Sequence, residues 1–180
     1  MQQNEWTMSH RLYERIENMV SEISNQLDIF DKASIQQANK RQITSSKSHD
    51  FKKPKYQPIS CNPNLRLYKY TKGQWFGRHV DDSNKIKLTS DAPSNISDAK
   101  ETQTEITVLF YLSSCRGGAT RFYMPKSKGK KDDTTAFTPE AGAVLLHIHG
   151  DRCLEHEAEP VLEGVKYGKL SVLTVLFHVS

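Results

Sequence analysis

The sequence predicts a mostly β-stranded core with helical support, arranged as a β-sandwich or an open barrel. Several short runs rich in β-branched and aromatic residues follow one another, and Gly, Pro and Asp residues separate them. One amphipathic stretch comes before these runs. Strands and helices do not alternate along the chain, which argues against a doubly wound parallel sheet.

The first expected element is a helix that begins at Ser9, a plausible N-cap residue, and reaches about Phe30. Its apolar residues repeat with helical period and form one stripe, which we expect to pack on a sheet. The stripe consists of Leu12, Ile16, Met19, Val20, Ile23, Leu27 and Phe30. The basic stretch that follows, to about Pro58, is expected to be mostly loop, with a short helix near residues 34–40.

The expected strands lie in the remainder of the chain. They are LRLYKY (65–70), EITVLFYL (105–112), TRFYM (120–124), GAVLLHIH (142–149) and LSVLTVLFHV (170–179). Gly117 and Gly118 predict a turn between strands that needs positive φ angles. Residues 83–104 are polar and poor in strand signals, and a loop of that length in a compact domain is typical of a lid or of disorder.

Length and composition fit one soluble domain over residues 1–180, with a helical and basic lead-in (1–60) before the core (61–180). No apolar run approaches the roughly 20 residues of a membrane span, and the first residues lack the features of a signal peptide. The three cysteines are widely spread, so we expect no disulfide framework and a cytoplasmic or nuclear location.

The net charge of +4 is concentrated in two basic clusters, residues 32–58 and 126–131. Solvated loops are the favoured interpretation, and a surface for an acidic protein or for nucleic acid is the alternative. Neither cluster has interleaved aromatic residues that could stack on bases, which weakens the nucleic-acid alternative.

The segment RHVDDS places His79 and Asp81 two residues apart, so on a strand both side chains point to one face. Alone, such a pair is more often a surface ion pair. With one further histidine it becomes two imidazoles and a carboxylate, which leaves three open positions and suits non-haem Fe(II) and oxygen chemistry.

Three histidines compete for the third position: His147, His149 and His156. Only His156 has a basic residue, Lys166, ten positions later, where a cation could meet an acidic cosubstrate. His147 and His149 are then core or rim residues, or partners that orient the metal ligands.

Cys153 is interpreted as a small buried residue rather than a ligand or a nucleophile. A structural zinc site built from this cysteine and the three histidines is an open alternative, although its spacing fits no closed zinc motif.

Four segments resemble the 2-oxoglutarate/Fe(II) dioxygenases of the prolyl 4-hydroxylase type: residues 62–83, 104–123, 139–167 and the closing strand. The resemblance implies a double-stranded β-helix (jelly roll) in which His79, Asp81 and His156 bind Fe(II). It also implies that Lys166 pairs with the distal carboxylate of 2-oxoglutarate and that the Tyr70 hydroxyl assists it. The segment KYGKLSVLTV lacks the arginine of the nearest relatives, so Lys169 is an alternative anchor.

The resemblance implies an oxygenase that uses Fe(II), 2-oxoglutarate and O2, with ascorbate a further possible requirement. The expected reaction is hydroxylation of a C–H bond in a protein or peptide side chain such as proline, with release of succinate and CO2. The alternatives are an oxidative demethylase of nucleic acid and a non-catalytic, metal-stabilised binding module. Expected substrate contacts are Arg78, Asp82, Arg121 and Tyr123, with residues 83–104 as a lid. No membrane partner is expected, and the sequence does not predict the oligomeric state.

Overall fold

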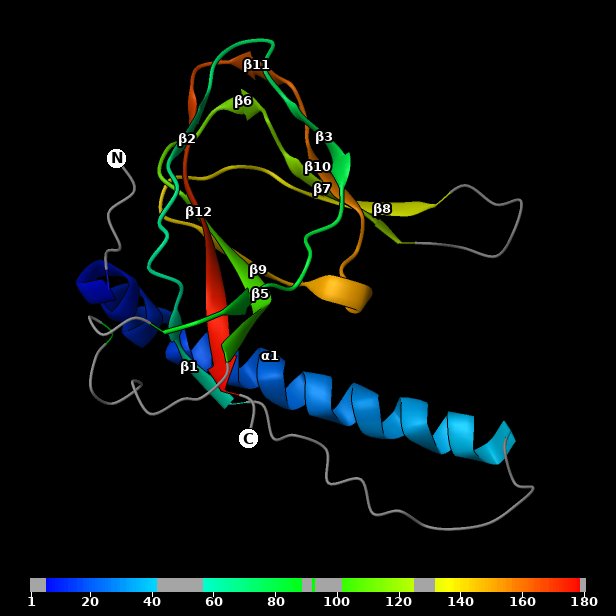
Figure 1. Cartoon of the computed structure of the whole chain (residues 1–180). Coiled ribbons are helices and arrows are strands. Elements are labelled where there is room, and N and C mark those ends of the chain that lie inside the picture. The colour runs from blue at the N-terminus through cyan, green and yellow to red at the C-terminus, as the bar shows by residue number, and fades with distance from the viewer. Residues whose placement is uncertain (1–5, 42–56, 89–91, 93–101, 125–131, 179–180) are drawn as a thin grey trace.

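The computed structural model describes residues 6–41, 57–88, 92, 102–124 and 132–178, and for residues 25–41, 57 and 168–178 it describes the backbone alone. Its one helix in this part of the chain, α1, spans Trp6–Arg41 and is followed by twelve strands (Figure 1). The strands are β1 (Gln57–Cys61), β2 (Tyr68–Tyr70), β3 (Phe76–His79), β4 (Lys85–Ile86), β5 (Thr102–Tyr111), β6 (Arg116–Gly117), β7 (Thr120–Met124), β8 (Asp133–Phe137), β9 (Val144–Ile148), β10 (His156–Ala158), β11 (Val161–Glu163) and β12 (Lys166–His178). A 3-10 turn, Gly150–Arg152, separates β9 from β10.

All strand pairs are antiparallel. The larger sheet has the order β1-β12-β5-β4, with β2 added to β12 and β9 added to β5. The second sheet has the order β3-β10-β7-β8, and β11 and β6 form a separate pair. The predicted fold class, a mostly β jelly roll with one N-terminal helix, is therefore confirmed.

Helix α1 is longer than predicted at both ends. Ser9 is not its N-cap: the residue lies inside the first turn, is fully buried, and donates a hydrogen bond to the carbonyl oxygen of Trp6 at 2.9 Å. The helix also continues through residues 34–40, which were expected to form a separate short helix. Residues 31–41 contain no Gly or Pro, so nothing in the sequence interrupts the helix there.

The apolar stripe of α1 packs on the larger sheet, as expected. Ile16 and Val20 are buried against strand residues, whereas Met19 is 42% exposed. The core shared by helix and sheet contains Tyr13, Ile16, Val20, Cys61, Ile106 and Val108, with Leu12, Ile23, Leu65, Phe110, Val144 and Leu146 packed around it. The side chains of Leu27 and Phe30 lie outside the described set.

A smaller cluster forms around Trp6, which is 5% exposed and contacts Ile59, Ile86, Leu88 and Ala92. This cluster holds β4 and the following residues beside the start of α1. The segment 83–104, which was expected to be poor in strands, contains β4 and the first residues of β5. Residues 89–91 and 93–101, the main part of the expected lid, lie outside the described residues.

No helix in the described ranges is both long enough and apolar enough to cross a lipid bilayer.

Candidate metal centre

Strand pairing brings the first two candidate ligands together. His79 at the end of β3 and His156 at the start of β10 are direct antiparallel partners, and their ring centroids are 4.3 Å apart. Asp81 follows β3 by two residues. Its Oδ1 is 3.5 Å from Nε2 of His79, and its Oδ2 is 3.8 Å from Nε2 of His156. The donor atoms of the three residues lie within 4.8 Å of one another, which suits a single metal ion.

Backbone hydrogen bonds orient both imidazoles. Nδ1 of His79 lies 2.8 Å from the carbonyl oxygen of Gly77, and Nδ1 of His156 lies 2.9 Å from that of Leu154. A neutral imidazole that donates through Nδ1 carries its lone pair on Nε2. Burial lowers the pKa of His156, which favours this neutral form. Both Nε2 atoms therefore present lone pairs toward the Asp81 carboxylate, as metal binding requires.

Thr107 on β5 holds the carboxylate in place. Its hydroxyl donates to Oδ2 of Asp81 at 2.7 Å and also contacts Nε2 of His149. A hydroxyl has one proton, so the Thr107–His149 contact requires Nε2–H of His149 as the donor. Burial alone would raise the pKa of the Asp81 carboxyl. The Thr107 hydrogen bond and the neighbouring imidazoles lower that pKa by more, so the net result is a pKa below the ordinary value. The sequence offered no signal for Thr107.

His147 lies at the same carboxylate, although sequence reasoning treated it as a core, rim or orienting residue. Its Nε2 is 3.6 Å from Oδ2 of Asp81, and its ring centroid is 4.6 Å from that of His156. Its Nδ1 faces the carbonyl oxygen of Ile148 at 3.3 Å, so Nε2 again carries the lone pair. Burial and the neighbouring His156 lower the pKa of His147 to about 4. Three imidazoles, not two, thus surround Asp81.

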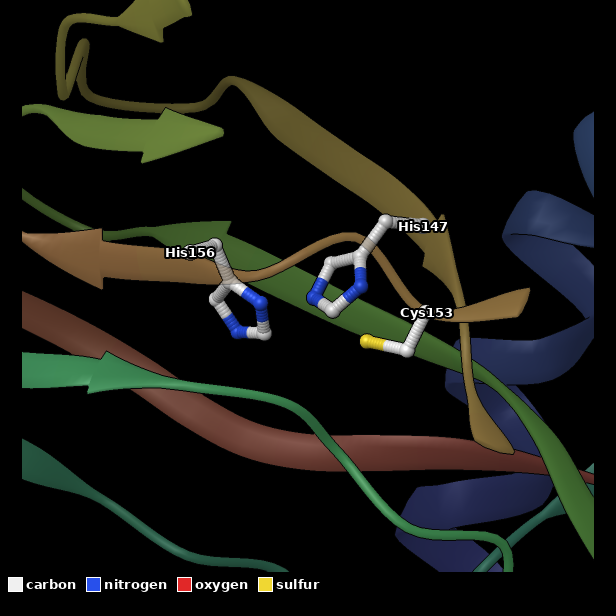
Figure 2. A group of neighbouring side chains, drawn as sticks. All are labelled: His147, Cys153 and His156. Atoms are coloured by element: carbon white, nitrogen blue, oxygen red, sulfur yellow. The ribbon is translucent and has the colours of Figure 1, made fainter. Parts of the chain in front are cut away.

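Cys153 also lies beside this group. The residue is half-buried, and its Sγ accepts a hydrogen bond from the backbone N–H of Asp81 at 3.3 Å. Its sulfur and the nitrogen donors of His147 and His156 are within 4.8 Å of one another (Figure 2). The zinc alternative left open by the sequence had four residues, and the structure brings these three together. The fourth, His149, belongs to neither of the two groups of described residues that could hold a metal ion.

A cavity of about 260 Å³ extends from the metal candidates to Lys166. Lys166 begins β12, is 4% exposed, and donates from Nζ to the carbonyl oxygen of Gly118 at 2.7 Å. Burial lowers its pKa to about 8. The cavity walls include Arg66, Tyr68, Tyr70, Phe76, Thr107, Leu109, Phe110, Tyr111, Thr120, Glu157 and Ala158.

Two aromatic rings flank the lysine. Tyr70 is its partner across the β2–β12 pair, and Nζ lies 5.9 Å from the Tyr70 ring centroid. The described interaction is with the ring, and the role that the resemblance implied for the Tyr70 hydroxyl stays a prediction. Nζ is also 5.6 Å from the ring of Tyr111, a residue that sequence reasoning missed. The side chain of the alternative anchor, Lys169, lies outside the described set.

The turn that supplies the carbonyl partner of Lys166 has the predicted backbone. Gly117 and Gly118 have φ angles of 75° and 66°, a region that favours glycine. A Cβ at Gly117 would lie 2.5 Å from the carbonyl oxygen of Pro160, so glycine is also required there for space. The turn fixes the position of the Gly118 carbonyl beneath the ammonium group.

Three of the side chains that were expected to contact the substrate are already paired with other side chains of this protein. Arg78 pairs with Asp132 at 3.0 Å and with Glu155, and its guanidinium lies 3.7 Å from the Tyr123 ring centroid. Arg121 pairs with Glu159, and the Tyr123 hydroxyl donates to Glu157 at 2.6 Å. Arg78, Arg121 and Tyr123 thus belong to a polar network along the second sheet. None of the three lines the cavity that extends to Lys166, although the Tyr123 partner Glu157 does.

The family model described as the 2OG-Fe(II) oxygenase superfamily matches residues 65–175, more than half of the chain. The matched region begins just before β2 and includes every residue of the candidate centre. No curated protein matches the chain significantly.

Proposed function

The chain belongs to the 2OG-Fe(II) oxygenase superfamily, and we propose that it is an active oxygenase that hydroxylates a C–H bond in a protein or peptide side chain, with proline the first candidate. One observation carries the proposal: His79, Asp81 and His156 converge at one end of a cavity whose other end holds the buried ammonium of Lys166.

The donor set suits ferrous iron. Two neutral imidazoles and one carboxylate are the ligands that non-haem Fe(II) oxygenases use, and they leave positions open for a chelating cosubstrate and dioxygen. In this chain the backbone carbonyls of Gly77 and Leu154 turn both Nε2 lone pairs inward. The Thr107 hydroxyl orients the carboxylate.

Lys166 supports 2-oxoglutarate as the cosubstrate. Its ammonium is buried, and among the described residues no carboxylate lies within salt-bridge distance of Nζ. A buried charge is costly unless it is paired. A dicarboxylate that reaches from the metal to this end of the cavity would supply the missing partner through a charge-assisted hydrogen bond.

The roles of the protein are to position the reactants and to exclude water. When bound, iron and 2-oxoglutarate supply the dioxygen chemistry, with succinate and CO2 as products. Lys166 fixes the far carboxylate, and the rings of Tyr70 and Tyr111 shield the ammonium. Leu109 and Phe110 add apolar walls that keep solvent from the centre.

Apolar side chains beside β3 favour a peptide substrate. Trp75, Phe76 and Val80 are 60%, 50% and 47% exposed. Phe76 begins the strand that carries His79, and the other two lie directly before and after that strand. Arg78 and Arg121, the nearby cations, are already paired with carboxylates. These apolar contacts favour a peptide, and besides Lys166 the cavity wall carries one described Lys or Arg side chain, the exposed Arg66, as positive charge for a nucleic-acid backbone.

Succinate release tests the proposal. Purified protein with Fe(II), ascorbate and 2-oxoglutarate should form succinate, and His79→Ala and Lys166→Ala should abolish it or reduce it to background. Lys69→Ala is the matched control, because Lys69 is exposed on the strand beside the Lys166 end of β12. Proline-containing peptides should raise the rate more than methylated oligonucleotides do.

The binding-module alternative makes the opposite prediction. Tightly held zinc with no succinate from the wild-type protein would overturn the oxygenase proposal. Stimulation by methylated oligonucleotides and not by peptides would retain the chemistry but overturn the proposed substrate class.

A further inference from the structure

We propose that the centre has a second metal-binding mode, in which His147, Cys153 and His156 hold a thiolate-preferring divalent ion such as Zn²⁺. The inhibitory consequence derived below rests on the proposed oxygenase function, whereas the binding mode itself does not. Figure 2 shows the three side chains, with the sulfur of Cys153 turned toward the two imidazole rings.

The distances permit such a site. The three donor atoms already lie within 4.8 Å of one another. Zinc bonds of about 2.3 Å to sulfur and about 2.0 Å to nitrogen place tetrahedral ligands roughly 3.5 Å apart, so a side-chain shift of about 1 Å closes the site. Oδ2 of Asp81 is 3.6 Å from Nε2 of His147 and can complete four ligands.

An unsatisfied nitrogen gives independent support. Nε2 of His147 is buried and has no hydrogen-bond partner among the described residues, and the side chain is only 9% exposed. A buried polar atom without a partner costs free energy. Because Nδ1 faces the carbonyl of Ile148, the free atom is the lone pair that a metal would bind.

The sulfur selects the class of ion. Thiolate ligands favour Zn²⁺ and Co²⁺ over the harder Mn²⁺ and Mg²⁺, which prefer oxygen ligands. The backbone N–H of Asp81 already points at Sγ and stabilises the thiolate once it forms. Binding converts the thiol to a metal thiolate, so one proton is released for each ion bound.

The two modes share one atom and therefore exclude each other. Nδ1 of His156 is engaged with the carbonyl of Leu154, so only its Nε2 can bind a metal. His156 is a member of both the His79–Asp81–His156 set and the His147–Cys153–His156 set. With Nδ1 engaged, each set has only the Nε2 lone pair of His156 to use. A zinc ion in the second mode consequently keeps ferrous iron out of the first, which makes zinc an inhibitor of the proposed oxygenase.

Cobalt spectroscopy of the metal-free protein tests the binding mode. One equivalent of Co²⁺ should produce a thiolate-to-cobalt charge-transfer band in the near ultraviolet. Cys153→Ser should abolish the band, and His147→Ala should abolish or strongly weaken it. Cys115→Ser, which changes the other half-buried cysteine, and His79→Ala should both retain it.

Metal binding to the wild-type protein and to one variant can overturn the proposal. Tight Co²⁺ binding without the charge-transfer band, or a band that persists in Cys153→Ser, would contradict a Cys153 ligand. Zn²⁺ should release bound Mn²⁺ one for one, as followed by the Mn²⁺ resonance signal. Simultaneous binding of both ions would contradict the shared His156.

The inhibitory consequence has its own readout. Zn²⁺ should suppress succinate formation in the wild type, and Cys153→Ser should be markedly less sensitive. If the wild-type protein forms no succinate, the proposed function fails, but the cobalt band still tests the second binding mode. If succinate forms but the band is absent, the oxygenase stands and the second mode fails.

Discussion

At the scale of single residues, Lys166 shows most clearly how surroundings set chemistry. Burial lowers its pKa to about 8, so the ammonium of the free protein loses its proton as pH rises through that value. A carboxylate beside Nζ favours the charged form and raises that pKa in the complex. Binding of 2-oxoglutarate above pH 8 therefore requires proton uptake.

We predict that affinity for 2-oxoglutarate falls by up to about tenfold per pH unit above about pH 8. Calorimetric titration of the Mn²⁺-loaded protein between about pH 7 and about pH 9 measures it. Lys166→Met should bind more weakly and without this pH dependence, while Lys69→Ala should behave as the wild type. A flat wild-type profile would show that another group anchors the cosubstrate.

Thr107 is the second residue whose effect can be isolated. Its hydroxyl is the only described side-chain donor to the Asp81 carboxylate, so Thr107→Val should weaken Mn²⁺ binding by about 10- to 100-fold. Thr107→Ser should restore most of the affinity. Thr104→Val removes another buried hydroxyl of β5, the acceptor for the Asn84 N–H, and should leave metal affinity nearly unchanged. Equal losses in both valine variants would indicate a general structural effect.

At the scale of elements, the sequence predicted β2, β5, β7, β9 and β12, because their β-branched and aromatic runs are distinct, and it missed short strands such as β1, β4 and β11. It did not predict the ends of α1. Residues 31–41 carry few apolar side chains, so the helical repeat of apolar residues ends before the helix does. Ser9 matched the residue type of an N-cap, but Trp6, buried among Ile59, Ile86 and Leu88, places the helix start one turn earlier.

Helix α1 lies before the matched family region, and its packing predicts that it unfolds together with the core. Ile16 is 3% exposed against the larger sheet, so Ile16→Ala should lower the free energy of unfolding by about 2–5 kcal/mol. Met19→Ala, on the exposed face, should change it by less than about 0.5 kcal/mol. Urea unfolding followed by circular dichroism and fluorescence measures both. An early, separate helical transition in Ile16→Ala would show that α1 is independent of the core.

At the scale of the whole molecule, the strand pattern predicted a β-sandwich or open barrel, and the family resemblance implied the jelly roll. The candidate metal ligands were expected in two segments far apart in the chain. The pairing of β3 with β10 accounts for their meeting. The pairing of β5 with β9 accounts for what the sequence did not reveal, because it places Thr107 directly opposite His147. A linear sequence gives each histidine of LLHIH the same local pattern, and only the sheet register separates their environments.

The central claim is that His79, Asp81 and His156 bind iron in a cavity that also receives 2-oxoglutarate at Lys166. Chelation of ferrous iron by a 2-oxo acid produces a visible charge-transfer band, so anaerobic absorption spectroscopy tests the claim most directly. The account predicts a band when Fe(II) and 2-oxoglutarate are added to the wild type, its loss in His156→Ala, and a higher 2-oxoglutarate requirement in Lys166→Ala. Absence of the band in the folded wild-type protein, or its persistence in His156→Ala, would contradict the account.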